Sequence, residues 1–274
     1  MNMKDYTKEL SFAKNLAYRA GDVMLKYLPS SVKKVKENNS PVTEADIAIS
    51  KIIIAEISKN FPKHAIIDEE IKSDIQNAEY VWVCDPLDGT IPFANGVPTS
   101  MFSLALCQNQ KPVVAVCYDP FMKRLYYSSE NNNSFLNDQK IEVNKNDLSR
   151  GECILAVPYW FNNFLKPKEF NINLFYKLLH EKNLILSLVE SCVYSSMLVA
   201  SGKITATILP AAYPWDRAAA KLIIKNANGL YLDENRKEIT VFGKYGLGIV
   251  TNRIVSDQIL KIVDTCLIDP LNKN

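Results

Sequence analysis

Apolar side chains recur at helical spacing near the start of the chain. Over residues 7–28 they occupy Leu10, Ala13, Ala17, Ala20, Met24 and Leu28. This spacing predicts a long amphipathic helix. A second helix is predicted to begin after Thr43 as its N-cap, with Asp46 at the third helical position of a capping-box-like pattern. It is expected to end before Phe61, because a residue that precedes proline is disfavoured in a helix.

Shorter apolar runs between the helical segments predict strands. In the first half these runs lie at residues 65–67, 80–84, 101–107, 112–118, 126–128 and 141–143. The third and fourth runs are expected to form a hairpin around Asn109 and Gln110. In the second half, strands are predicted at 153–157, 185–189, 203–209 and 246–251, and helices at 172–179, 191–200, 215–226 and 255–267. This alternation predicts a mixed, layered α/β fold.

Two sub-domains are predicted to meet in the polar segment 145–151. The first, residues 1–145, carries most of the acidic motifs considered below. The second, residues 146–274, supplies the last of them and a wall for the substrate. A chain of 274 residues is long enough to bury a full core in this arrangement.

The charge balance argues against nucleic acid or an anionic membrane as a partner. The chain has 32 basic and 30 acidic residues and a net charge of +2, so no field of a single sign is expected. No apolar run approaches the roughly 18 residues that a bilayer-spanning helix requires. The N-terminus is polar and lacks the apolar core of a signal peptide, so we expect a cytoplasmic protein.

Cysteine and histidine usage narrows the chemistry. The six cysteines are widely spaced, without a Cys-x-x-Cys pair, and most lie in apolar stretches that are typical of buried, reduced thiols. Neither His64 nor His180 has a second histidine or a cysteine nearby. Zinc chemistry and histidine-phosphate chemistry are therefore not expected.

Four acidic segments stand at predicted strand ends or helix starts. They are Asp46, Glu69-Glu70, Asp85-Pro86-Leu87-Asp88-Gly89-Thr90 and Trp215-Asp216. In the third segment, the strand is expected to leave the sheet at Pro86, to present two carboxylates and to turn at Gly89. Mg²⁺ prefers oxygen ligands, commonly one or two carboxylates with waters and phosphate oxygens. Backbone N–H groups of Gly89 and Thr90 at a helix start would suit a phosphate.

Simpler interpretations exist for single members of this set. Asp46 could serve only as an N-terminal residue that the helix dipole favours. Glu70 could be solvated or could support the ligands from behind, and Trp215 could pack beside the last aspartate rather than stack on a ligand. Four such segments in one chain are harder to explain in this way, so we favour a metal site.

Other phosphatase chemistries fit the sequence less well. Enzymes with an aspartyl-phosphate intermediate need two aspartates separated by one residue, whereas two residues separate Asp85 from Asp88. A cysteine phosphatase loop needs Cys-x5-Arg, but the residue at that distance is not arginine for Cys84 or for Cys117. Neither of these two nucleophile arrangements is therefore expected.

Together these segments resemble the inositol monophosphatase family. That family belongs to the lithium-sensitive, Mg²⁺-dependent phosphatase superfamily, with fructose-1,6-bisphosphatases and bisphosphate nucleotidases. The matching motifs are Ile-Asp-Glu-Glu at 67–70, Asp-Pro-Leu-Asp-Gly-Thr at 85–90 and Trp-Asp-Arg-Ala-Ala at 215–219, and the segment 134–143 is similar to the family's mid-chain hairpin. The resemblance covers essentially the whole chain. It implies a layered αβαβα sandwich of the sugar-phosphatase type, a phosphomonoesterase with metal-activated water, and a homodimer.

The resemblance also implies a set of metal ligands. Glu69, Asp85 and the backbone carbonyl of Leu87 would hold one Mg²⁺. Asp85, Asp88 and Asp216 would hold a second, and the working site would contain two or three ions. Such cations neutralise a phosphate dianion and lower the pKa of water.

Further residues match positions that act on the substrate. The N–H groups of Gly89 and Thr90 would bind the phosphate, and Thr90 with Asp46 would help to deprotonate the attacking water. Ser191 and Cys192 match positions at which the family's backbone touches substrate, although a plain helix start explains them about as well.

The sequence departs from the inositol phosphatases where the substrate would bind. Those enzymes place a glutamate seven residues before the Trp-Asp aspartate, and this chain has Leu209 there. Leucine cannot accept a hydrogen bond from a ring hydroxyl. We therefore expect inositol 1-phosphate to be a poor substrate, with Tyr213 or Arg217 supplying the missing polarity. A shift of the loop by one or two residues, which brings in another acceptor, is the alternative.

Several other functions remain compatible with the motifs. On the same scaffold the activity could be that of a 3′(2′),5′-bisphosphate nucleotidase, a fructose-1,6-bisphosphatase or a histidinol phosphatase. A non-catalytic regulatory protein and a structural cation-binding protein are the alternatives outside catalysis. The presence of every proposed ligand argues against the first of these two, and Gly89-Thr90 after the aspartates argues against the second.

Overall fold

The helices form where the apolar periodicity predicts them. The computed structural model describes residues 4–28, 32–35, 41–71, 78–148, 154–156, 169–187, 189–210, 213–244 and 246–268. The helices within these ranges are α1 (Thr7–Tyr27), α2 (Glu44–Asn60), α3 (Thr90–Ala94), α4 (Ile172–Glu181), α5 (Cys192–Ala200), α6 (Pro214–Asn226) and α7 (Ser256–Cys266). Of these, α3 has only five residues and is the helix for which the sequence predicted no more than a start.

The strands form two main sheets. In the described residues they are β1 (Val32–Val35), β2 (Pro41–Thr43), β3 (Ala65–Asp68), β4 (Tyr80–Asp88), β5 (Met101–Gln108), β6 (Lys111–Asp119), β7 (Arg124–Ser129), β8 (Ser134–Leu136), β9 (Gln139–Ile141), β10 (Ile154–Ala156), β11 (Glu169–Phe170), β12 (Ile185–Ser187), β13 (Ala206–Pro210), β14 (Leu230–Leu232), β15 (Leu247–Thr251) and β16 (Leu267–Ile268). One sheet has the order β3-β4-β5-β6-β7-β8-β9, and the other has the order β12-β10-β13-β15-β14. Two small antiparallel pairs, β1-β2 and β11-β16, complete the set.

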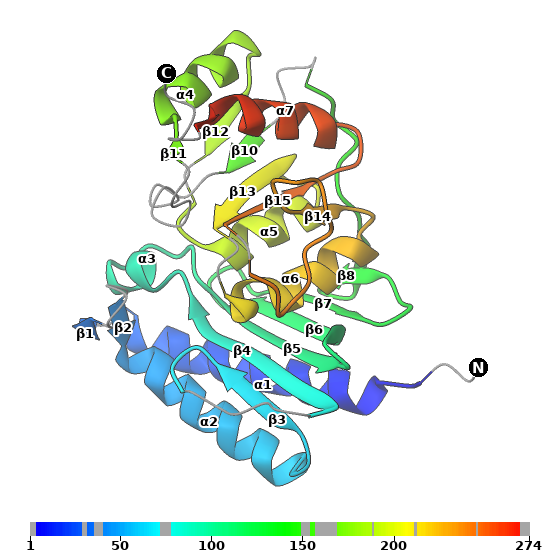
Figure 1. Ribbon diagram of the computed structural model, residues 1–274. Coiled ribbons are helices and arrows are strands. Elements are labelled where there is room, and N and C mark those ends of the chain that lie inside the picture. Colours follow the sequence, from blue (N-terminus) through cyan, green and yellow to red (C-terminus); the bar gives the residue numbers. More distant parts are fainter. Residues whose placement is uncertain are drawn as a thin grey trace.

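The two sheets and their helices stack in five layers (Figure 1). Helices α1 and α2 cover one face of the seven-stranded sheet and bury a cluster that includes Leu16, Ile53 and Trp82. Helices α5 and α6 lie between the two sheets, over a second cluster. Helices α4 and α7 cover the outer face of the five-stranded sheet with a third cluster. The predicted αβαβα sandwich is confirmed.

Two hairpin turns set the register of the first sheet. Asn109 and Gln110 have φ of 47° and 66° between β5 and β6, as the left-handed turn of a two-residue hairpin requires. Asn137 and Asp138 form an equivalent turn, so that Leu136 at the end of β8 pairs with Gln139 at the start of β9. Because β8 is only three residues long, this register ends β9 at Ile141. The predicted strand at 141–143 is therefore wrong beyond its first residue.

The strand that carries the acidic motif runs further than expected. We predicted that the chain would leave the sheet at Pro86, but β4 continues to Asp88. The register of β4 against β5 is irregular between Asp85 and Asp88. Because proline has no N–H to donate to a neighbouring strand, a sheet tolerates proline at an irregularity of this kind.

In the sequence, the predicted border between the two sub-domains falls between the last strand of the first sheet and the first strand of the second. The first sheet ends at Ile141 and the second begins at Ile154, and residues 149–153 lie outside the described part of the chain. The middle cluster draws side chains from both sheets, for example Val83 and Leu209. Because the two halves share this core, the division at residue 145 stays a prediction.

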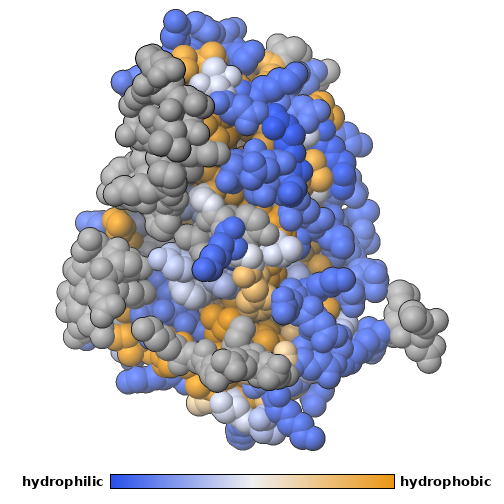
Figure 2. All heavy atoms as spheres, in the orientation of Figure 1, coloured by the Kyte–Doolittle hydropathy of each residue, from blue (hydrophilic) through white to orange (hydrophobic). Residues whose placement is uncertain are grey.

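Much of the exterior in one view is hydrophilic. Hydrophilic side chains cover much of the right-hand side of the view in Figure 2. Within the described ranges, no helix has both the length and the apolar character needed to cross a membrane.

Candidate active site

Two predicted metal ligands come from the end of β4. Asp85 lies opposite Ser103 of β5, and Asp88 lies opposite Met101. Side chains three positions apart on a regular strand point to opposite faces, but these two lie opposite partners that are two positions apart. The irregular register therefore turns both carboxylates to one face of the sheet. They are 2% and 7% exposed.

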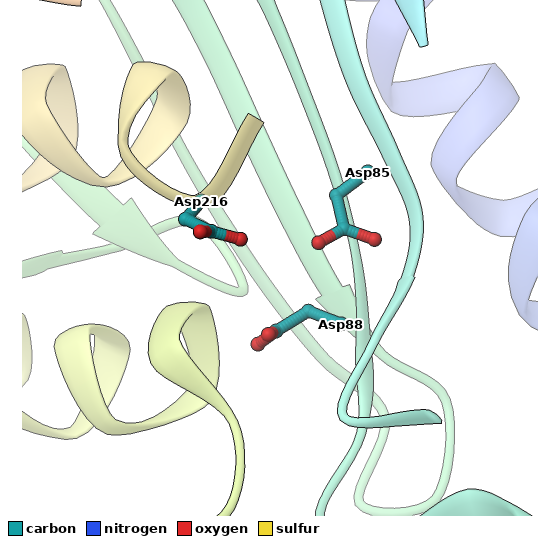
Figure 3. Close-up of side chains that lie close together, drawn as sticks. All are labelled: Asp85, Asp88 and Asp216. Atoms are coloured by element: carbon teal, nitrogen blue, oxygen red, sulfur yellow. The ribbon is translucent and has the colours of Figure 1, made fainter. Parts of the chain in front are cut away.

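A third carboxylate comes from the second half of the chain. Asp216 is the third residue of α6, which begins with Pro214 at a position where proline is favoured. Asp85, Asp88 and Asp216 each offer one oxygen, and these oxygens all lie within 4.8 Å of one another (Figure 3). The structure thus brings together three of the acids that the sequence predicted, from positions 131 residues apart.

The two other predicted ligands lie beside this cluster. The Glu69 amide donates to the carbonyl of Cys84 at 3.2 Å and extends the pairing of β3 with β4. Its carboxylate raises the pKa of both Asp85 and Asp216, which places its charge close to them. The carbonyl of Leu87 accepts a hydrogen bond from the Thr90 hydroxyl at 3.3 Å. Metal binding by Glu69 and Leu87 stays a prediction.

The Asp88 carboxylate sits at the N-terminus of α5. Its Oδ1 accepts the Cys192 amide at 3.2 Å, and its Oδ2 accepts the amides of Val193 and Tyr194 at 2.8 and 3.2 Å and the Ser191 hydroxyl. Ser191 is also the N-cap of α5 and accepts from the Tyr194 amide. The substrate contacts predicted for Ser191 and Cys192 stay predictions, and the contact seen for both is with Asp88.

Asp46 and Thr90 meet at a second helix start. The predicted capping box is confirmed, since Thr43 donates to Asp46 Oδ2 through its amide at 2.8 Å and through its hydroxyl. The other oxygen, Oδ1, lies 3.4 Å from the Thr90 hydroxyl. The two residues predicted to act on the attacking water are therefore in contact with each other.

Gly89 requires its glycine for two separate reasons. It has a φ of +85°, in the left-handed region that favours glycine. A Cβ at this position would lie 3.1 Å from Ser191 Cβ, from the Thr99 carbonyl and from Ser100 Oγ. The Ser100 hydroxyl donates to the Gly89 carbonyl at 2.7 Å and secures the turn. Ser100 is a supporting residue that the sequence did not predict.

Burial and mutual repulsion dominate the electrostatics of the carboxylate cluster. Burial raises the pKa of Asp85 well above its usual range, and the neighbouring charges of Glu69 and Asp88 raise it further. Burial likewise raises the pKa of Asp216, with like charge from Asp88 adding to it and the Arg217 guanidinium opposing it. The pKa of Asp88 rises only to about 6, because the Ser191 hydroxyl and the α5 amides oppose its burial. A bound cation would relieve this repulsion.

Three helices begin at this cluster and partly offset its negative charge. Asp46 is the third residue of α2, and Asp216 holds the same position in α6, where it accepts a backbone hydrogen bond from Tyr213. Asp88 receives the first amides of α5. Helix N-termini favour negative charge, so each of these buried carboxylates has a helix dipole directed at it.

Leu209 and Arg217, which were considered in the prediction of substrate binding, are both buried. Leu209 is fully buried in the middle cluster on β13. Arg217 is 1% exposed and donates to the carbonyls of Val241 and Gly243. Its predicted role in supplying polarity to a substrate is therefore wrong, because its guanidinium is committed to this loop.

The aromatic residues before Asp216 form a stacked pair. The rings of Tyr213 and Trp215 lie 4.8 Å apart at an angle of 5°. Trp215 also packs against the middle cluster, which favours the packing interpretation of this residue over a free stacking platform.

Besides the Ser100 hydroxyl, the contacts that the sequence did not reveal come from backbone amides. The amides of Val193 and Tyr194 bind Asp88, yet neither side chain carries a recognisable signal. The available clue was the helix start at Ser191, because every helix begins with amides that lack a partner within the helix.

Comparison with known proteins agrees with this geometry. Residues 5–267 match the sequence model of the inositol monophosphatase family. The chain is 27% identical to a fructose-1,6-bisphosphatase/inositol-1-monophosphatase of Thermotoga maritima, with 93% of this chain and 95% of the relative covered. It is 30% identical to the Nus factor SuhB of Pasteurella multocida, with 96% and 98% covered. Inositol monophosphatase 2 of Homo sapiens is also 30% identical, with 81% and 78% covered.

Solved structures give the same result. An inositol monophosphatase of Thermotoga maritima superposes with a TM-score of 0.83 at 26% identity, with 95% of this chain and 98% of that chain covered. An inositol monophosphatase from Anabaena superposes with a TM-score of 0.81, also at 26% identity, with 98% and 99% covered.

Proposed function

We infer that this chain, which belongs to the inositol monophosphatase family and is a phosphoric monoester hydrolase, releases phosphate from a small soluble ester with the help of Mg²⁺. The observation that carries the proposal is the convergence of Asp85, Asp88 and Asp216, whose oxygens lie within 4.8 Å of one another. Such a set of hard oxygen donors suits Mg²⁺ rather than a soft metal.

The residues around the cluster fit a site for two or three ions. Asp85 would contribute to more than one ion, one shared with Asp88 and Asp216 and another shared with Glu69 and the Leu87 carbonyl. The raised pKa of Asp85 supports the fit, because a cation would offset both of its causes, the burial of the carboxylate and the repulsion by its acidic neighbours. Bound Mg²⁺ would neutralise phosphate charge and acidify water.

The protein's own groups would orient the phosphate and accept a proton. The amides of Gly89 and Thr90 stand at the start of α3, where N–H groups have no partner within the helix. The Thr90 hydroxyl, 3.4 Å from Asp46 Oδ1, can pass its proton to that oxygen as it accepts one from the attacking water. The capping box holds Asp46 in place for this step.

The proposal predicts an absolute requirement for a divalent cation. Protein stripped with EDTA should release no phosphate above background from inositol phosphates, sugar phosphates, histidinol phosphate or adenosine 3′,5′-bisphosphate. Added Mg²⁺ should restore activity on at least one of these esters, because the buried carboxylates cannot themselves offset a phosphate dianion. Phosphate release would be followed colorimetrically. Full activity in the presence of EDTA contradicts the metal-assisted mechanism.

A second prediction concerns the substrate. Leu209 stands where inositol phosphatases have a glutamate, and it is buried in the core, so no side chain at this position accepts a ring hydroxyl. An unpaired buried hydroxyl costs about 1–3 kcal/mol, or roughly one to two decades in specificity. Inositol 1-phosphate should therefore have a kcat/KM at least about tenfold below that of another sugar, nucleotide or amino-alcohol phosphate. A dominant kcat/KM for inositol 1-phosphate would show the inference to be wrong.

Three further properties are proposed on the strength of family membership alone. Lithium would compete for the cation site formed by Asp88 and Asp216. The protein would form a homodimer and act in the cytoplasm. Inhibition by Li⁺, sedimentation and cell fractionation test these properties one by one.

A further inference from the structure

A chain of polar contacts starts at the turn between β6 and β7. Asp119 is fully buried at the end of β6 and lies opposite Arg124, the first residue of β7. Its Oδ2 accepts Nε and Nη2 of Arg124 at 2.9 and 2.6 Å. Its Oδ1 accepts the amides of Phe121 and Met122 at 2.9 and 3.2 Å. The turn therefore closes around a buried carboxylate that also fixes the direction of the guanidinium.

The same guanidinium reaches across to the second half of the chain. Nη2 of Arg124 donates to the hydroxyl of Tyr194, and its Cζ lies 5.1 Å from the centroid of that ring. A planar guanidinium with several fixed donors can serve Asp119 and Tyr194 at once, which the single ammonium of a lysine does poorly. Tyr194 is thereby anchored to the first sheet.

The backbone of Tyr194 continues this chain of contacts to the cation site. Tyr194 is the third residue of α5, and its amide donates to Asp88 Oδ2 at 3.2 Å. The Val193 amide and the Ser191 hydroxyl donate to the same oxygen. Among the described residues, Oδ2 therefore has three donors, whereas Oδ1 has one, the Cys192 amide. Since each carboxylate oxygen offers about two lone pairs, Oδ1 is the oxygen of Asp88 with capacity left for a cation.

We propose that Arg124 and Tyr194 are positioning residues for the cation site. They clamp the first turn of α5 against β7, and the amides of that turn hold Asp88 with Oδ1 open to the metal. The inference rests on the proposed function, because it takes Asp88 as a ligand. Groups that orient metal ligands typically change metal affinity by about tenfold or more when they are removed.

The decisive variant is Tyr194→Phe. It removes the hydroxyl that Arg124 binds but keeps the ring, and it leaves the pair between Arg124 and Asp119 intact, so the fold should survive. The Kd for Mg²⁺, measured by calorimetry on metal-free protein, should rise about tenfold. The Mg²⁺ concentration for half-maximal phosphate release should rise by the same factor, with a smaller change in kcat at saturating Mg²⁺. Adding Arg124→Gln should weaken Mg²⁺ binding little further, because the contact with Tyr194 is already lost, although losing the pair with Asp119 should lower the melting temperature.

The matched control is Tyr127→Phe, which removes a phenol hydroxyl from β7, the strand that carries Arg124. That hydroxyl donates to Asp138 at 2.6 Å on the exposed surface, and not to a residue of α5. Its loss should leave the Kd for Mg²⁺ unchanged. If Tyr194→Phe lowers the melting temperature but not the affinity for Mg²⁺, the clamp is merely structural and this inference falls while the proposed function stands. If the unaltered protein binds no Mg²⁺, both fall.

Discussion

Replacing Asp85 by asparagine is expected to abolish Mg²⁺-dependent phosphate release and at the same time to stabilise the metal-free protein. Asp85 is the acid that would serve more than one ion, and removing such a charge from a buried site costs about a thousandfold in rate. Burial disfavours the same charge when no cation is present, and Glu69, Asp88 and Asp216 repel it; both effects raise the pKa of Asp85. Asparagine removes that repulsion and can still accept the Leu87 amide, now 3.0 Å from Asp85 Oδ1.

Two measurements separate these effects. Phosphate release at saturating Mg²⁺ should fall to background, whereas the melting temperature in EDTA should rise by a few degrees, since about 1 kcal/mol shifts it by about 2–4 °C in a chain of this size. Asp22→Asn, on the exposed face of α1, is the control and should change neither quantity. An Asp85→Asn protein that melts earlier in EDTA than the unaltered protein would contradict the repulsion argument, and one that keeps its activity would contradict the metal site.

Replacing Gly89 by alanine is expected to damage both stability and activity. The left-handed φ of +85° costs an L-residue about 1–2 kcal/mol. The new Cβ would also press on Ser191 Cβ and on the Thr99 carbonyl, each 3.1 Å away, and a backbone carbonyl cannot move aside cheaply. We expect the free energy of unfolding to fall by about 2–3 kcal/mol. Activity should fall more than tenfold, because Ser191 is displaced from Asp88.

Gly96→Ala provides the matched control for that experiment. Gly96 also has a positive φ, of 74°, but it is exposed and follows α3 on the surface. It should show only the backbone cost of about 1–2 kcal/mol and unchanged phosphate release. Denaturant unfolding and kcat/KM would be measured for both variants. If the two variants lost equal amounts of stability and activity, the contacts of the added Cβ at position 89 with Ser191 and Thr99 would have no effect.

Local structure was predictable because its causes are close together in the sequence. Asp46 and Thr43 form a capping box because they are three residues apart at a helix start. Asn109 and Gln110 form a hairpin because a two-residue turn joins two apolar runs, and asparagine readily accepts the positive φ that this turn requires. The end of β9 was mispredicted because the turn at Asn137 and Asp138 sets the register of β8 and β9. The pattern of apolar residues, from which the strand was predicted, carries no information about that register.

The candidate site was predictable as a list of residues but not as an arrangement. Asp85, Asp88 and Asp216 were identified from their motifs, and the structure brings them together. That Asp85 and Asp88 share one face depends on the irregular pairing of β4 with β5. Pro86 is compatible with such an irregularity, but the residues 85–88 alone do not specify which partners on β5 they pair with.

The sequence by itself determined the chemistry available to this protein. The acidic motifs, the helix starts beside them and the leucine at position 209, which cannot accept a hydrogen bond, can all be identified from short stretches of sequence. Only the tertiary structure decided how these parts are used. Asp88 is held by the amides of α5, and Arg217 is committed to the carbonyls of Val241 and Gly243. The physical reason is that hydrogen bonds between distant elements depend on how whole layers pack, whereas caps and turns depend on a few adjacent residues.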